Sequence, residues 1–279
     1  VEEDELLFTV PRSACLTLKD AIVDPACGEA FAKLIEKAGP GGNTVAMAGY
    51  MAKEYLIQKT SPETPNDLSF GPYLATLPWE RGVNSQEHVL FWSGEDVEKY
   101  LEGTMCCDEA TALRSEVDLA IKVINSIVAP SIRAARGEEA ESAGFSWPWE
   151  VKQASSGLVD GIDGAVKGAF VSLLTRSFED GDEDNGEKLV PLLDLLQHSK
   201  EPNVSHIMRK ADGTVEVRAK RKLDAGDELL NQYREEEEET MPKHRFFSRF
   251  GFVPGASAKE IPNMLEDSCS IFYPQKAEV

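Results

Sequence analysis

The sequence predicts a mixed α+β fold in which a sheet-forming unit is interrupted by a mostly helical insertion. Short strand-like runs open the chain, helical periodicity dominates from about residue 43 to residue 168, and strand-like runs return after it. A sheet unit carrying an inserted helical block explains this order more economically than two independent domains. We therefore expect a sheet unit in two pieces, residues 1–43 and 169–255, a helical insert at 44–168 and a tail at 256–279.

The first piece begins with a strand and ends with a helix. Leu6 to Pro11 is a short apolar run stopped by a proline, which predicts a strand, and Leu16 to Leu18 is a second short apolar segment. Phe31 to Lys37 has helical spacing. The breaker Gly39-Pro40-Gly41-Gly42 follows it directly, so we expect the helix to end there.

The insert is dominated by apolar residues at intervals of three to four, as on one face of a helix. Its first helix is expected to have Asn43 or Thr44 as its N-cap. The stretch from Thr60 to Asn66 is rich in proline and polar residues and is predicted to be a loop. Helical patterns cover Val45 to Leu56, Gly94 to Leu101, Glu109 to Val128 and a further candidate segment, Ser131 to Glu141.

The second piece reads as strands joined by turns. Asp212-Gly213 predicts a hairpin turn before the alternating strand Thr214 to Ala219. Ala225-Gly226-Asp227 predicts another turn before a short strand, Glu228 to Leu230. The apolar runs Ala169 to Leu174 and Leu189 to Leu196 are also expected to be strands, separated by the acidic loop Glu179 to Glu187.

The end of this piece combines a charged loop with a short helix. The consecutive glutamates Glu235 to Glu239 repel one another and favour a solvated loop. Thr240 is expected to cap a helix with Pro242 in its first turn and Gly251 just past its end.

The chain is strongly acidic, with 29 Lys and Arg against 49 Asp and Glu, a net charge of −20. Such a chain is repelled by phosphate backbones, so direct nucleic-acid binding is disfavoured. An acidic surface attracts a basic peptide, although solubility is the plainer main reason for the charge. No apolar run approaches the roughly 20 residues that span a bilayer, so we expect no membrane insertion.

The cysteines and the first residues bear on the compartment. The five cysteines are odd in number and irregular in spacing, so reduced intracellular thiols explain them better than a disulfide framework. Cys106-Cys107 lacks a CxxC or histidine partner, which disfavours a zinc site. The acidic start is neither a secretory signal nor a transit peptide. We expect an intracellular protein of cytoplasm or nucleus, with the chloroplast left open.

Family resemblance rests on four groups of motifs in a fixed order. They are Leu6 to Pro11; Phe70 to Trp79 with Leu90 to Ser93 and Tyr100 to Thr104; Thr175 to Phe178 with Leu189 to Ser199; and Ala225 to Leu229 with Asn231 to Tyr233 and Phe250 to Phe252. In this order they resemble the SET-domain protein methyltransferases of the Rubisco large-subunit and actin-histidine type. The resemblance covers most of residues 6–254.

The resemblance implies a SET fold, a mixed β fold threaded as a pseudoknot, and S-adenosylmethionine as the methyl donor. The cofactor and the acceptor side chain would enter from opposite sides of a narrow channel, and no metal is needed. The implied activity is protein-lysine N-methylation of a protein or peptide substrate. Histidine methylation is the alternative within this class, and a catalytically inactive SET-like interaction module is the alternative outside it. The oligomeric state stays open.

Two residues match the family's reaction centre. Tyr233 occupies the position of the catalytic tyrosine, whose phenol oxygen orients the acceptor nitrogen. Arg176 matches the arginine that contacts the cofactor's carboxylate, a use that suits its forked guanidinium. The plain alternatives are a tyrosine at the end of a core strand and a surface arginine.

Further residues match the family's cofactor and acceptor sites. Gln197 and His198 stand where the family has an Asn-His pair that contacts the cofactor. Phe252 matches the aromatic residue on the adenine face, and Phe250 matches one that lines the acceptor channel, although both are equally well read as core residues. Asp194 is expected to be a structural polar partner within the pseudoknot.

Departures from the family pattern affect the expected affinity for the cofactor. Gln197 is one methylene longer than the family's asparagine, and Arg234 replaces the glycine after the catalytic tyrosine. The family's glycine-rich strand, which precedes the Leu6 strand, has no counterpart because no glycine occurs before Gly28. We therefore expect residues 1–279 alone to bind S-adenosylmethionine weakly or not at all.

Overall fold

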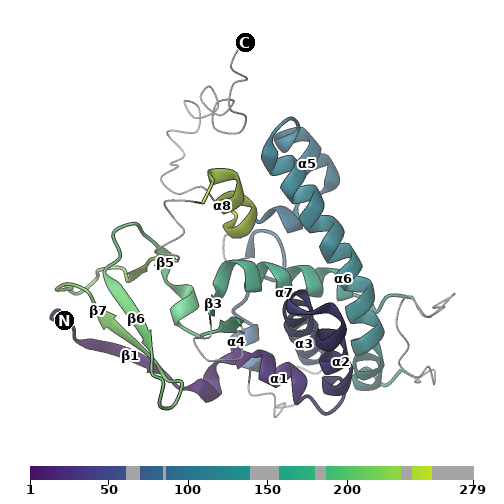
Figure 1. Cartoon of the computed structure of the whole chain (residues 1–279), viewed down its shortest axis with the longest axis horizontal. Coiled ribbons are helices and arrows are strands. Elements are labelled where there is room, and N and C mark those ends of the chain that lie inside the picture. Colours follow the sequence, from purple (N-terminus) through teal and green to yellow (C-terminus); the bar gives the residue numbers. More distant parts are fainter. Residues whose placement is uncertain (61–69, 84–85, 139–156, 180–186, 234–240, 253–279) are drawn as a thin grey trace.

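A computed structural model describes residues 1–60, 70–83, 86–138, 157–179, 187–233 and 241–252. A helical body lies on one side of the molecule and a strand region on the other (Figure 1). The body contains α2, α3, α6 and α7, the strand region contains β1, β6 and β7, and α8 lies between α5 and the strands.

The elements follow one another in the order predicted for a sheet with a helical insertion. In the first half they are β1 (Leu6–Val10), the 3₁₀ turn η1 (Arg12–Ala14), β2 (Leu16–Thr17), α1 (Leu18–Ile22), α2 (Gly28–Ala38), α3 (Pro40–Thr60), α4 (Gly71–Leu74), η3 (Val89–Phe91), α5 (Gly94–Leu101) and α6 (Met105–Ala135). In the second half they are α7 (Ile162–Arg176), β3 (Ser177–Glu179), β4 (Glu187–Leu189), η4 (Leu193–Leu195), β5 (Gln197–His198), β6 (Val204–Met208), β7 (Val215–Ala219), β8 (Leu230–Asn231) and α8 (Lys243–Phe250).

The strands of the two sequence pieces pair with each other, as one interrupted sheet unit requires. β1 pairs antiparallel with β7, which pairs with β6, and β2 pairs antiparallel with β4, which pairs with β3. β5 and β8 form a short parallel pair with His198 opposite Asn231. The helical insert therefore leaves the sheet unit and returns to it.

Several sequence predictions are confirmed. β1, α2 and α5 lie where apolar spacing placed them, and α5 begins after Ser93, whose hydroxyl accepts from the Asp96 N–H at 3.0 Å. The hairpin at Asp212-Gly213 joins β6 to β7, with Gly213 at φ +67°. α8 ends at Gly251 at φ +82°, a left-handed conformation that favours glycine.

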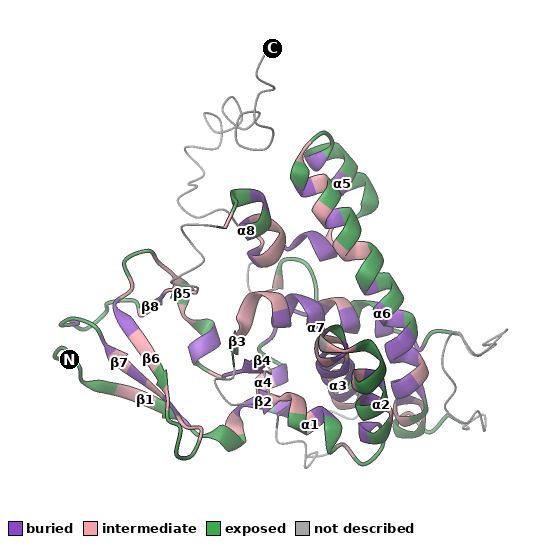
Figure 2. Ribbon diagram, in the orientation of Figure 1, coloured by how far each residue is buried: buried purple, intermediate pink, exposed green. Residues whose placement is uncertain are grey.

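The predicted strand Ala169 to Leu174 is wrong, because these residues lie inside helix α7. This helix crosses the predicted boundary at residue 168, and its residues 168–173 are all buried (Figure 2). An apolar run without a polar face lacks helical periodicity, so its pattern cannot be told from that of a buried strand. Of the run Leu189 to Leu196, only Leu189 belongs to a strand, and η4 occupies Leu193–Leu195.

The other corrections concern where elements begin and end. α3 begins at Pro40 rather than after Asn43 or Thr44, because a proline is tolerated at the first position of a helix. Only Gly39, the C-cap of α2, separates the two helices. α6 continues through Pro130 to Ala135 and so includes part of the segment predicted separately from Ser131. The last short strand is Leu230–Asn231, and Pro242 is the N-cap of α8 rather than part of its first turn.

Other loop predictions fall wholly or mainly outside the described residues. They concern the stretches Thr60 to Asn66, Glu179 to Glu187 and Glu235 to Glu239, and the cap at Thr240.

The helical body positions the end of α7. Gly168 lies so close to Trp79 that an added Cβ would stand 2.8 Å from the Trp79 Cα. Trp79 stacks on Tyr55 with ring centroids 3.9 Å apart and donates its indole N–H to the Leu74 carbonyl at 2.7 Å. This close packing fixes α7, whose last residue is Arg176, against α3 and α4.

Candidate active site

Arg176 and Asp194 form a buried ion pair at the junction of α7 and the strand region. The Arg176 guanidinium donates to the Asp194 carbonyl at 3.2 Å and to its Oδ2 at 3.5 Å. The Tyr73 hydroxyl, from α4, donates to the same Oδ2 at 2.9 Å. Asp194 Oδ1 is buried without a hydrogen-bond partner among the described residues. Burial raises the pKa of Asp194, and Arg176 and Tyr73 oppose that shift.

A tight turn brings Asp194 into this position. Leu192, just before η4, has φ +70°, a left-handed conformation that is uncommon for a residue with a side chain. The Asp194 N–H then donates to the Val190 carbonyl at 3.1 Å. The carboxylate is thereby turned towards α7, as the prediction of a structural polar partner required.

Tyr233 lies beside this ion pair. Its hydroxyl donates to the Leu196 carbonyl at 3.0 Å, and its backbone N–H donates to His198 Nδ1 at 3.4 Å. Burial raises the pKa of Tyr233, while Arg176 lowers it and Asp194 raises it. The phenol is therefore neutral at ordinary pH, with its proton directed at a backbone carbonyl.

An aromatic cluster surrounds Tyr233. We use this name for the rings of His198, Tyr233, Phe246, Phe250 and Phe252. The His198 centroid lies 5.2 Å from that of Tyr233 and 5.7 Å from that of Phe252. Phe250 lies 5.7 Å from Tyr233 and 4.6 Å from Phe246. The structure thus brings together the predicted Tyr233, His198, Phe250 and Phe252.

Phe246 belongs to this cluster although the sequence reasoning missed it. It is buried on α8, one helical turn before Phe250. The i, i+4 spacing of the two phenylalanines was the available signal, because residues so spaced share one face of a helix.

Asn203 was also missed, and it connects the segment just before β6 to residues 228–230 and to Lys220. Its backbone N–H donates to the Leu230 carbonyl at 3.0 Å, and its side chain accepts from the Leu230 N–H at 2.7 Å and donates to the Glu228 carbonyl at 2.8 Å. Its own carbonyl accepts from Lys220 at 2.9 Å. These bonds hold residues 197–203 against 228–231, as the predicted threaded arrangement requires. Sequence pattern alone gives no signal for an asparagine with this many partners.

The predicted cofactor residues differ in how they are placed. His198 is inside the aromatic cluster, whereas Gln197 is exposed. Arg176 is directed at Asp194. The buried Asn231 amide nitrogen has no hydrogen-bond partner among the described residues, so a donor is available beside His198. Aromatic faces, a free amide donor and the unpartnered Asp194 Oδ1 fit a ligand that carries an aromatic base and cationic groups.

The described residues contain no group of three or more His, Cys, Asp or Glu side chains that could hold a metal ion. None of their helices is long and apolar enough to cross a membrane.

The fold and this site define a SET-domain protein. The family model for the SET domain matches residues 3–234, and the chain belongs to that family. It is 24% identical over 234 residues to the N-lysine methyltransferase setd6 of Salmo salar, covering 84% of this chain and 45% of the relative. It is 28% identical over 264 residues to N-lysine methyltransferase setd6 of Xenopus laevis, covering 91% and 49%.

Solved structures give the same fold. The SET domain of LSMT bound to lysine and AdoHcy matches 91% of this chain with a TM-score of 0.61 at 13% identity, and 48% of that chain is covered. Rubisco LSMT bound to sinefungin and monomethyllysine matches with a TM-score of 0.59, also at 13% identity, covering 91% of this chain and 48% of that chain. The chain spans about half the length of the curated relatives it matches.

Proposed function

We propose that this SET domain catalyses the transfer of a methyl group from S-adenosylmethionine to the side-chain nitrogen of lysine in a protein. The observation that carries the proposal is Tyr233, a half-buried neutral phenol whose hydroxyl donates to the Leu196 carbonyl. The relatives named N-lysine methyltransferase and the neighbours with AdoHcy, lysine, sinefungin or monomethyllysine support both the activity and the cofactor.

Tyr233 would act by orienting the acceptor nitrogen. Because its hydrogen is committed to Leu196, the phenol oxygen is left with lone pairs, which can accept a hydrogen bond from an amine. A positioned acceptor of this kind aligns the nitrogen for in-line displacement without needing to be ionised. The neutral state that burial imposes on Tyr233 suits this role.

The cofactor would be held by the residues around Tyr233. Bound S-adenosylmethionine would supply the methyl group from its sulfonium sulfur, which leaves as a neutral thioether as the new bond to nitrogen forms. His198 and Phe252 offer ring faces to the adenine, and Asn231 offers its unpartnered amide donor. Arg176 is proposed to contact the cofactor's carboxylate, in exchange for part of its bonding to Asp194. Gln197 would contribute backbone contacts, since its side chain is exposed. Phe250 would line the acceptor channel.

The substrate is proposed to be a basic protein segment. The net charge of −20 favours association with a cationic partner at low ionic strength. The glutamates at 235–239 follow Tyr233 and Arg234 in the sequence and add to this acidic charge, and they lie outside the described residues.

The test combines cofactor binding with acceptor identity. Calorimetry measures binding of S-adenosylmethionine by residues 1–279 alone, which we expect to be weak or absent, and by a chain extended upstream, which should bind the cofactor. With labelled cofactor, a basic peptide library should be methylated on lysine, and replacing that lysine by histidine or arginine should abolish labelling. Labelling of histidine instead would indicate the histidine enzyme. Neither binding nor labelling by the extended chain would identify a non-catalytic module and refute the proposal.

A further inference from the structure

The aromatic cluster depends on helix α8, which is short. Phe246 and Phe250 lie on α8, and Phe252 follows Gly251, the C-cap of this helix. A helix of eight residues is not stable alone in water, so its position is set by tertiary contacts. The contacts that hold α8 therefore also place three rings of the cluster.

One carboxylate of the helical insert contacts α8 at three residues. Glu109, in the second turn of α6, accepts a hydrogen bond from the Ser248 hydroxyl at 2.7 Å through Oε2. Its Oε1 lies 3.4 Å from His244 Nε2 and 3.4 Å from Arg245 Nε. The Cys106 thiol, one turn earlier on α6, donates to the His244 carbonyl at 3.8 Å.

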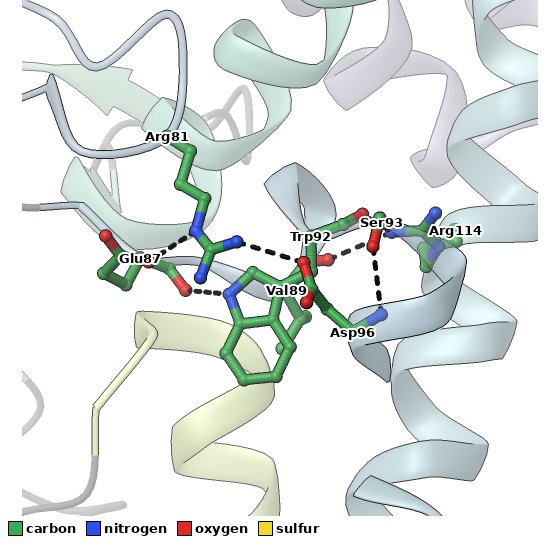
Figure 3. Close-up of polar contacts among 7 residues, drawn as sticks. All are labelled: Arg81, Glu87, Val89, Trp92, Ser93, Asp96 and Arg114. Carbon is green, nitrogen blue, oxygen red and sulfur yellow. Dashed lines mark hydrogen bonds and ion pairs between the residues drawn. The ribbon is translucent and has the colours of Figure 1, made fainter. Parts of the chain in front are cut away.

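Trp92 supports α8 from a second direction. Its ring meets Phe247 edge-on, with centroids 6.0 Å apart. Figure 3 shows how this indole is fixed: its N–H donates to the Glu87 carbonyl at 2.7 Å, and the Arg81 guanidinium lies 5.7 Å from the ring centroid. Arg81 is itself held by ion pairs to Glu87 at 2.7 Å and to Asp96 at 3.1 Å.

The end of α8 is enclosed as well. A Cβ added to Gly251 would stand 2.7 Å from Gln86 Oε1 and 3.4 Å from the His88 Cα. We call His88, Trp92, Cys106 and Glu109 the α8 seat. All of these residues belong to the helical insert, whereas Tyr233 and His198 belong to the returning sheet unit.

We infer that the insert positions the rings of Phe246, Phe250 and Phe252 through this seat, and that Glu109 is a positioning residue for the methyl-transfer reaction. The inference rests on the proposed function and identifies a part of the molecule on which that function depends. Within the described part of the chain, the contacts of Glu109 to α8 are with His244, Arg245 and Ser248. Glu109 therefore acts on the rings of Phe246 and Phe250 through the α8 turns that carry them.

The test compares substitutions at Glu109 with a matched substitution on the same helix. Glu109→Ala removes the Ser248 bond and both charge contacts, whereas Glu109→Gln keeps an acceptor for Ser248 and loses the charge. Glu116→Ala removes an exposed glutamate two turns further along α6 and is the control. Hydrogen exchange of the α8 amides, such as the Gly251 N–H bound to the Phe247 carbonyl, reports the helix directly.

We expect Glu109→Ala to speed exchange across α8 by roughly tenfold while exchange in α3 and α7 stays unchanged. Glu109→Gln should recover part of that protection, and Glu116→Ala should match the native protein. With S-adenosylmethionine and a lysine peptide that the native protein methylates, Glu109→Ala should lower kcat/KM by roughly tenfold. The melting temperature should stay unaltered.

Unchanged α8 exchange in Glu109→Ala would overturn the inference, as would a kcat/KM equal to that of the Glu116→Ala control. Failure of the proposed function is recognised separately, because the native protein would then neither bind S-adenosylmethionine nor transfer its methyl group. In that case the exchange comparison would still decide whether Glu109 holds α8, and protection equal to that of the native protein would again refute it.

Discussion

Asp194 and Glu54 are buried carboxylates with nearly the same local chemistry in different parts of the molecule. Their side chains are 0% and 4% exposed. Burial is the main cause that raises the pKa of each, and each has one oxygen without a partner among the described residues. Asp194 faces Arg176 and Tyr73, and Glu54 faces Lys53.

The difference lies in what surrounds each carboxylate. Lys53 is bonded to Asp24 and lies 2.7 Å from Glu54, inside the packing of α1, α2 and α3. Asp194 has Tyr233 within electrostatic reach and lies next to the aromatic cluster. A buried carboxylate with a raised pKa does not by itself mark an active site. Removing a partner should affect stability at Glu54 and chemistry at Asp194.

Among the substitutions that test this comparison, Lys53→Met is expected to have the largest effect. Both Asp24 and Glu54 would remain buried without their cation, and breaking a buried pair on one side costs about 3–5 kcal/mol. Denaturant unfolding measures the loss. Lys33→Met, which removes the exposed i,i+4 pair with Glu29, is the control and should change stability little. Equal effects of the two substitutions would show that the Lys53 cluster is unimportant for stability.

Acid should weaken the protein through His88 rather than through either carboxylate. Burial lowers the pKa of His88 to about 4, opposed by the nearby backbone of Ser248 and Arg249, and its Nδ1 accepts the Leu90 N–H at 3.2 Å. The pKa of His88 in the folded protein is lower than its ordinary value of 6.5. The stability that depends on neutral His88 is therefore fully present above pH 6.5 and is lost as the pH falls towards 4.

That loss amounts to roughly 3 kcal/mol for a fully buried histidine with this shift. The raised pKa values of Asp194 and Glu54 act in the opposite direction, since a carboxylate that protonates more readily when folded favours the folded state in acid. Unfolding free energies measured between pH 7 and pH 4 should fall in the native protein and fall less in His88→Asn. The same slope in both proteins would assign the acid sensitivity to another group.

Tyr233→Phe should affect the reaction and leave the fold intact. The substitution removes the hydroxyl bound to Leu196, and loss of a positioned group of this kind lowers methyl transfer by roughly a hundredfold. Tyr100→Phe, at a tyrosine that is 59% exposed on α5, is the control for the chemical change. The rate of methyl transfer and the melting temperature are measured together. A native rate in Tyr233→Phe would remove Tyr233 from the proposed mechanism.

Motifs in the sequence predicted which residues around Tyr233 lie together better than apolar patterns predicted the helical body. Tyr233, His198, Phe250 and Phe252 were found through motifs in a fixed order, and the fold brings them together although they come from two elements and the segments beside them. The order of the motifs predicts this proximity because β5 pairs with β8 through backbone hydrogen bonds. That pairing brings His198, in β5, close to Tyr233, which follows β8.

What could not be predicted depends on long-range burial. The prediction of a strand from Ala169 to Leu174 is wrong because residues 168–173 of α7 are all buried, so this part of the helix shows no alternation of apolar and exposed polar positions. The ion pair between Lys53 and Asp24 joins residues 29 positions apart, and a charged residue within an apolar pattern is ordinarily read as exposed. The exposed side chain of Gln197 likewise follows from the path of β5, which no local pattern specifies.

Tyr73→Phe has the smallest expected effect, and it tests whether Asp194 contributes to cofactor binding as well as to stability. It deletes only the hydroxyl that donates to Asp194 Oδ2, so Asp194, whose side chain is 0% exposed, keeps Arg176 but loses a hydrogen bond. The cost in stability should be about 1–2 kcal/mol, well below that of Lys53→Met, because a cation still faces the carboxylate. Methyl transfer should also fall, by less than in Tyr233→Phe, since Arg176 would be drawn closer to Asp194 and away from a bound carboxylate. Calorimetry with S-adenosylmethionine should show this as weaker binding.

If Tyr73→Phe lowers stability but leaves cofactor affinity and transfer unchanged, then Asp194 is a structural carboxylate like Glu54, and the difference between the two regions lies in Tyr233 alone.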